Sequence, residues 1–169
     1  MEVLKYDLDL PSILPIEFHQ FDPEEPMLWV LHADKIPPHL GVSSKNSYFS
    51  LKYNGKDEFL PVDSVIKLLK QKKIKTLLFV LRDAISAQEI ELNFSTFTRT
   101  ETGRTTCLNP IKTLLNCPNV QTLKELLAEL DDNEQIESVR GLNIDQTFQG
   151  IIDYSIQDIH NRLKVLEDA

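Results

Sequence analysis

The chain has 169 residues, a length typical of one domain, and is long enough to bury a hydrophobic core. Hydrophobic residues make up 41 % of the chain and charged residues 26 %, which excludes a wholly disordered protein. No apolar run, residues 28–31 included, is long enough to span a bilayer, and no basic segment of a signal peptide opens the chain. We therefore expect a cytoplasmic protein without a membrane span.

The net charge of −8 argues against nucleic acid as a partner, because an acidic protein repels phosphate backbones. Most of this charge lies in residues 119–169, which carry 4 basic and 11 acidic side chains. The 5 glycines stand alone, so the chain lacks the glycine cluster that wraps nucleotide phosphates. The 2 cysteines, Cys107 and Cys117, are too few for a zinc knuckle and are expected to be free thiols. We expect no cofactor.

The first half of the chain predicts an extended arm, a strand, a β-hairpin and a helix. Residues 1–26 contain 4 prolines and read as the arm, and the apolar residues 27–32 predict the strand. Residues 39–53 alternate around Lys45 and Asn46, which is typical of a hairpin. Its apolar face carries Leu40, Val42, Phe49, Leu51 and Tyr53, and its polar face carries His39, Gly41, Ser43, Tyr48, Ser50 and Lys52.

The rest of the chain, from residue 61 onward, is predicted to be mainly helical. Residues 61–73 have a helical apolar stripe, with Asp63 as a candidate cap, and residues 76–81 predict a strand. The pattern over residues 84–98 is compatible with a helix or a strand. A short helix that includes residues 109–115 is expected to begin right at Cys107. Two amphipathic helices are expected over residues 122–131 and 144–167.

These patterns predict an α+β core over residues 1–118 and an acidic helical extension over residues 119–169. The core would be a small antiparallel sheet packed against the helix that carries Cys107. In the extension, apolar residues follow a heptad spacing over about two heptads. That stripe either packs on its own domain or pairs with a second copy, so a homodimer through residues 144–167 is open. The stripe comprises Ile152, Ile156, Ile159, Leu163 and Leu166.

Cys107 is the first candidate for chemistry. At a helix start, unpaired backbone N–H groups and the positive end of the dipole favour a thiolate over a thiol. A nucleophilic thiolate also needs a general base, and His39, on the polar face of the hairpin with Gly41 beside it to keep that face open, is the candidate. The alternative is structural, because free cysteines are often buried and a histidine after two prolines can satisfy a turn carbonyl.

Other histidines carry weaker signals. His32 and Asp34 together with His39 suggest a metal site, but they lack a second carboxylate or a helical ligand pair, so no metal is expected. His19 lies in the proline-rich arm and His160 on the acidic extension, where both are expected at the surface.

A family resemblance rests on the segment Pro38-His39-Leu40-Gly41-Val42 and on the hairpin that ends in Phe49-Ser50-Leu51. This segment resembles the His-x-Gly-hydrophobic strand of circularly permuted papain-like cysteine hydrolases, the NlpC-type and lecithin-retinol-acyltransferase-like proteins. The following order is also similar, because a helix, a strand and then Thr106-Cys107 at a helix start come after the histidine strand. The similarity covers about residues 27–116.

The resemblance implies a papain-like fold in which Cys107 is the nucleophile and His39 the base. The family places a polar third residue on the strand after the histidine, and Ser50 or Lys52 occupies the matching face here. The implied activity is an amidase, peptidase or acyltransferase reaction through a Cys107 thioester, with a small-molecule, peptide or lipid substrate. The alternative is a non-catalytic interaction protein that keeps the fold and self-associates through its C-terminal helices.

Overall fold

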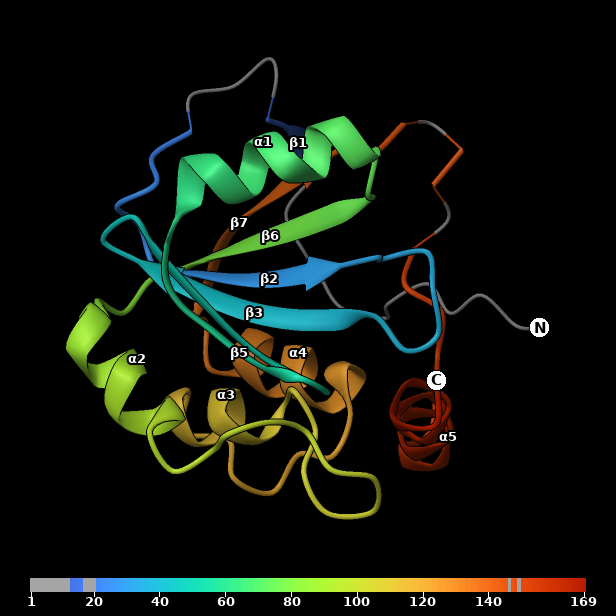
Figure 1. Ribbon diagram of the computed structural model, residues 1–169. Coiled ribbons are helices and arrows are strands. Elements are labelled where there is room, and N and C mark those ends of the chain that lie inside the picture. Colours follow the sequence, from blue (N-terminus) through green and yellow to red (C-terminus); the bar gives the residue numbers. More distant parts are fainter. Residues whose placement is uncertain (1–12, 17–20, 146, 149) are drawn as a thin grey trace.

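A computed structural model of the protein shows an α+β fold built on one large sheet (Figure 1). The structure describes residues 13–16, 21–145, 147–148 and 150–169. In this part of the chain the sheet has seven strands in the order β1-β7-β6-β2-β3-β4-β5. The strands are β1 Ile13–Pro15, β2 Met27–Leu31, β3 His39–Ser44, β4 Ser47–Lys52, β5 Gly55–Pro61, β6 Thr76–Leu81 and β7 Ile136–Leu142.

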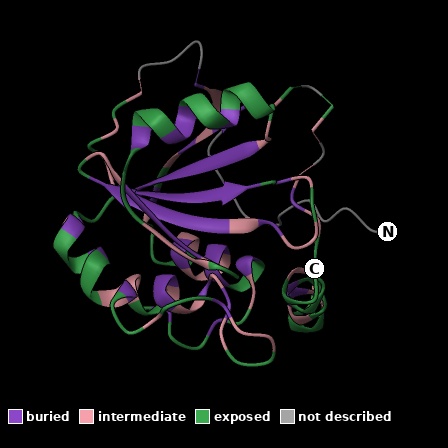
Figure 2. Ribbon diagram, viewed as in Figure 1, coloured by how far each residue is buried: buried purple, intermediate pink, exposed green. Residues whose placement is uncertain are grey.

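The sheet is larger than the small antiparallel sheet that the sequence predicts. All neighbouring strands pair antiparallel except β1 and β7, which are parallel. The central strand β2 is buried along its whole length, which explains its continuous apolar sequence (Figure 2). Most of the predicted arm lies outside the described residues, but residues 13–15 of it form β1.

Helices cover both faces of the sheet. One face packs against α1 (Val62–Lys72), and the other packs against α2 (Ala87–Phe94), α3 (Asn109–Leu114) and α4 (Leu123–Asp132) (Figure 1). The two layers of side chains form two cores. Leu28, Val42 and Phe79 belong to the core under α2, α3 and α4, whereas Trp29 and Leu78 belong to the core under α1.

Several predicted elements are confirmed. The hairpin has its turn at Lys45 and Asn46, and Leu40, Val42, Phe49 and Leu51 all face the larger core. The helix predicted over residues 61–73 is α1, the strand over 76–81 is β6, and the helix over 122–131 is α4. Residues 84–98, which were compatible with a helix or a strand, contain the helix α2 and no strand. Ser86 and Glu89 form its capping box. Asp63 does not cap α1, whose N-cap residue is Pro61.

The C-terminal part differs from its prediction as a helical extension. Strand β7 lies inside the sheet between β1 and β6, so residues 119–169 contribute to the same core as residues 1–118. The last helix, α5, covers Ile156–Glu167 rather than the whole of 144–167, with Ser155 and Asp158 forming its capping box. Among the described residues, no helix combines the length and apolar character that crossing a bilayer requires.

Helix α5 packs against the loop that precedes Cys107. The carboxylate of Glu167 accepts hydrogen bonds from the backbone and hydroxyl of Thr102, and Nδ1 of His160 accepts one from Gly103 N–H at 2.8 Å. Ile159 and Leu163 from the predicted heptad stripe are buried within the chain, whereas Ile156 remains exposed. The stripe therefore packs mainly on its own domain, which was one of the two interpretations left open.

Candidate active site

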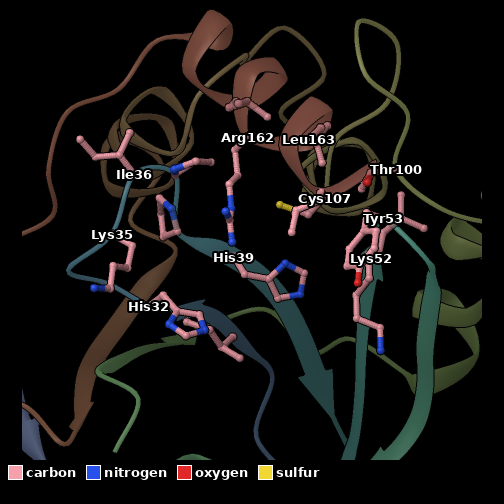
Figure 3. A pocket seen from close by; sticks show the side chains of 16 residues that line it. His32, Lys35, Ile36, His39, Lys52, Tyr53, Thr100, Cys107, Arg162 and Leu163 are labelled. Atoms are coloured by element: carbon pink, nitrogen blue, oxygen red, sulfur yellow. The ribbon is translucent and has the colours of Figure 1, made fainter. Parts of the chain in front are cut away.

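A cavity of about 550 Å³ opens at the end of the sheet where β2 ends and β3 begins. The loop between these strands, residues 32–38, forms one wall, the end of β4 forms another, and α5 contributes lining side chains that include Arg162 and Leu163 (Figure 3). His39 and Cys107 both line this cavity, so the structure brings the two predicted catalytic residues to one place. Among the hydrogen bonds of the described residues, none joins the side chains of His39 and Cys107.

Cys107 lies two residues before the first residue of α3. It is therefore not at the helix N-terminus that was predicted to favour a thiolate. The turn is held by Thr106 and Asn109, whose side chains accept hydrogen bonds from Leu108 N–H and Thr106 N–H. Burial raises the pKa of the Cys107 thiol to about 11, although hydrogen bonding to the backbone of Leu40 and of Cys107 itself opposes the increase. The sequence predicted a thiolate; burial of the sulfur next to the larger core instead favours the neutral thiol.

His39 begins β3, opposite Leu31 of β2, and is half-buried. Burial lowers the pKa of its imidazole to about 4, and the nearby charge of Asp57 opposes this decrease only in part. Desolvation disfavours the charged form of a histidine, so the ring is neutral at pH 7. A neutral imidazole has a free lone pair and can accept a proton, as a general base must.

Ser50 does not serve as the partner of the imidazole in this geometry. It is fully buried in β4, opposite Gly41, and its hydroxyl donates to the carboxylate of Asp57 at 3.2 Å. Asp57 also forms an ion pair with Lys52 at 2.9 Å. Among the described residues, the acidic group that acts on His39 is thus Asp57.

Sequence reasoning missed Asp57 because it missed β5. The signal was the Asn54-Gly55 pair directly after the predicted hairpin, which is a strong indication of a second tight turn. That turn folds β5 back on β4 and pairs Asp57 with Ser50.

The polar face of the hairpin is closed rather than open. A Cβ atom at Gly41 would lie 2.5 Å from the hydroxyl oxygen of Tyr48, so glycine is required there by the close approach of that ring. Tyr48 in turn packs edge-on against Trp29, whose indole N–H donates to Ser43 at 2.7 Å. Gly41 therefore makes room for a core aromatic ring and does not keep this face open, contrary to the prediction from the sequence.

The remaining histidines do not build a metal site in the described residues. His32 follows β2 with a positive φ of 54° and is exposed, and the described chain holds no group of three side chains able to ligate a metal. His160 binds the backbone of Gly103, as described above. His19 lies outside the described residues.

Comparison with known proteins gives no relative for this arrangement: no protein-family model, no curated protein and no solved structure matches the chain.

Proposed function

We propose that the protein is a papain-like cysteine hydrolase or acyltransferase that acts on an amide or ester, with Cys107 as nucleophile and His39 as general base. One observation carries the proposal: a thiol and a neutral imidazole, 68 positions apart in the sequence, line the same cavity. A nucleophile and a base within one substrate-sized space are the minimum that covalent acyl transfer requires.

The reaction would begin from a neutral pair. His39 removes the proton from Cys107 as the sulfur attacks the carbonyl carbon, and the imidazolium then gives this proton to the leaving alcohol or amine. The carbon–sulfur bond formed and the bond broken to the leaving group yield a thioester. Water or an acceptor alcohol or amine then attacks the thioester, with His39 again moving the proton, and the thiol is restored.

The pKa values of Cys107 and His39 determine when the proton can be transferred in this mechanism. Values of about 11 for Cys107 and about 4 for His39 differ by roughly 7, so complete proton transfer before attack would cost on the order of 10 kcal/mol. Proton transfer must therefore accompany carbon–sulfur bond formation instead of preceding it. Asp57 assists by favouring the imidazolium, since its charge raises the pKa of His39.

The experiment is hydrolysis of p-nitrophenyl octanoate by the full chain and by three variants. We expect turnover above the spontaneous rate, loss of at least about 100-fold in Cys107→Ser and in His39→Asn, and little change in Cys117→Ser. Cys117 is the matched control because it is a second free thiol that lies outside the cavity. Equal activity in all four proteins, or none above background, would refute the proposal.

The second candidate is a non-catalytic interaction protein that keeps the same fold. The observation that favours it is the neutral, unactivated state of both Cys107 and His39. Self-association through α5 would then use the exposed Ile156 and Val165, which are 42 % and 59 % exposed, because Ile159 and Leu163 are already buried. Light scattering tests this: Val165→Ser with Ile156→Ser should lower the mass of an oligomer, and an unchanged mass excludes this surface.

A further inference from the structure

The charged side chains around the cavity all have one sign. Among the described residues, Lys35, Lys52 and Arg162 line it and no aspartate or glutamate does, although the whole chain has a net charge of −8. Lys52 is neutralised by Asp57, whereas Arg162 forms no ion pair or hydrogen bond with any described residue. Figure 3 shows the Arg162 side chain reaching from α5 toward His39. The cavity therefore offers a free guanidinium beside the proposed nucleophile and base.

A second polar group in the cavity also lacks a partner. The hydroxyl of Thr100 is buried, with the residue 2 % exposed, and it makes no hydrogen bond within the described structure. Its backbone N–H is fixed by the carbonyl of Lys52 at 2.8 Å, which holds the residue at the cavity wall near the end of β4. Because an unsatisfied buried hydroxyl is costly, its presence at a cavity wall points to an oxygen atom of a ligand.

Most of the remaining lining is apolar and suits a hydrocarbon chain. The loop after β2, the end of β4 and α5 supply these side chains, and the volume is within the range of small-molecule sites. They include Leu31, Ile36, Pro37, Leu51, Ile159 and Leu163.

We propose that this cavity binds a small amphiphile: an apolar chain that ends in an anionic carboxylate or phosphate, with Arg162 and Thr100 contacting its oxygen atoms. The inference names a ligand class for the cavity that contains Cys107; that this ligand is part of a substrate, which must also carry the amide or ester bond, rests on the proposed function. Binding itself does not need the thiol. It is therefore measured in Cys107→Ala, so that a failure of binding and a failure of catalysis are told apart.

The probes are octanoate, octyl phosphate, 1-octanol and octyltrimethylammonium, titrated by calorimetry below their micelle concentrations. We expect the two anions to bind at least about tenfold more tightly than the alcohol, and the cation to bind weakest. Hexanoate should bind roughly 15-fold more weakly than octanoate, since each buried CH₂ contributes about fourfold in affinity. If only octyl phosphate or only octanoate binds, that result identifies the head group of the ligand as a phosphate or a carboxylate. Equal binding of octanoate and octanol would overturn the proposal, as would no binding of either anion.

Two variants locate the head group. Arg162→Gln should weaken octanoate binding by about fivefold or more, whereas Arg82→Gln, an exposed arginine outside the cavity, should leave it unchanged. Thr100→Val should weaken octanoate binding by about three- to tenfold while the melting temperature of the free protein stays equal or rises, because the lost hydroxyl has no partner.

The matched control for Thr100 is Thr106→Val. The Thr106 hydroxyl is hydrogen-bonded to Leu108 N–H and Asn109, so its loss should lower the melting temperature. If Thr100→Val lowers the melting temperature as much as Thr106→Val and leaves octanoate affinity unchanged, the hydroxyl is structural and the assignment of Thr100 is wrong.

Discussion

The alkylation rate of Cys107 as a function of pH distinguishes a buried neutral thiol from an activated thiolate. The reagent is iodoacetamide, which is small, uncharged and reacts with the thiolate. With a pKa of about 11, roughly 1 in 10,000 Cys107 side chains is a thiolate at pH 7. An unperturbed thiol with a pKa of about 8.5 has about 3 % thiolate, which is roughly 300-fold more.

The rate difference is smaller than the difference in thiolate population. A more basic thiolate is also a better nucleophile, and over this pKa range the gain is about tenfold. We therefore expect Cys107 to react about 30-fold more slowly than a free cysteine at pH 7. Its rate should still rise about tenfold for each pH unit up to pH 10, where an unperturbed thiol has levelled off.

The assay is peptide mass spectrometry after timed alkylation of the full chain, which separates Cys107 from Cys117. Cys117 should react more slowly still, because it is 1 % exposed and burial also raises its pKa to about 11. His39→Asn should leave the Cys107 profile nearly unchanged, since a neutral imidazole does not stabilise a thiolate. A rate that levels off below pH 8, or falls sharply in His39→Asn, would refute the neutral pair and indicate a preformed thiolate–imidazolium pair.

Three further predictions concern the residues that hold the site in place. Gly41→Ala should destabilise the fold by about 1–3 kcal/mol in urea denaturation, because its Cβ would overlap the Tyr48 ring. The loss of stability should be smaller in a Tyr48→Leu background, and an equal loss there would contradict the steric reason. Burial lowers the pKa of His39 from 6.5 in the unfolded chain to about 4 in the fold, so the unfolded state binds more protons between these values and the protein loses stability as the pH falls. The loss from pH 7 to pH 5 should be about 2 kcal/mol larger in the wild type than in His39→Asn, and equal losses would refute the buried neutral ring. Ser43→Ala leaves the Trp29 indole N–H without its acceptor and should cost about 1–3 kcal/mol in the same assay, whereas no cost would mean that another acceptor replaces it.

Local periodicity predicted the elements whose stability comes mainly from their own pattern. The hairpin, α1 and α4 each present apolar side chains on one face at the spacing of a strand or helix, and all three were found. Strands β5 and β7 were missed because their sequences mix charged and apolar residues. Each is specified by pairing with a neighbour, β4 or β6, and for β5 the local signal was the Asn54-Gly55 turn and not the apolar pattern of the strand.

The candidate site was predicted only in part, for a similar reason. The sequence predicted that Cys107 and His39 meet, and both line one cavity, although Cys107 precedes α3 and does not start it as predicted. The charge states were predicted wrongly for Cys107, because burial depends on the packing of distant segments and outweighs the favourable backbone groups. Nothing in the sequence indicated Arg162 or Thr100 as site residues. They stand out only in the folded structure, where neither side chain has a hydrogen-bond or ion-pair partner among the described residues.

The central claim is that His39 acts as the base for Cys107, and the rate of acyl-enzyme formation tests it most directly. Mixing with p-nitrophenyl octanoate, acid quenching and intact mass measurement follow the octanoyl group as it appears on the protein. We expect a thioester on Cys107 that forms at least about 100-fold faster in the wild type than in His39→Asn, with Cys117→Ser behaving as wild type. Equal rates in the wild type and His39→Asn, or an octanoyl group found on residues other than Cys107, would contradict it.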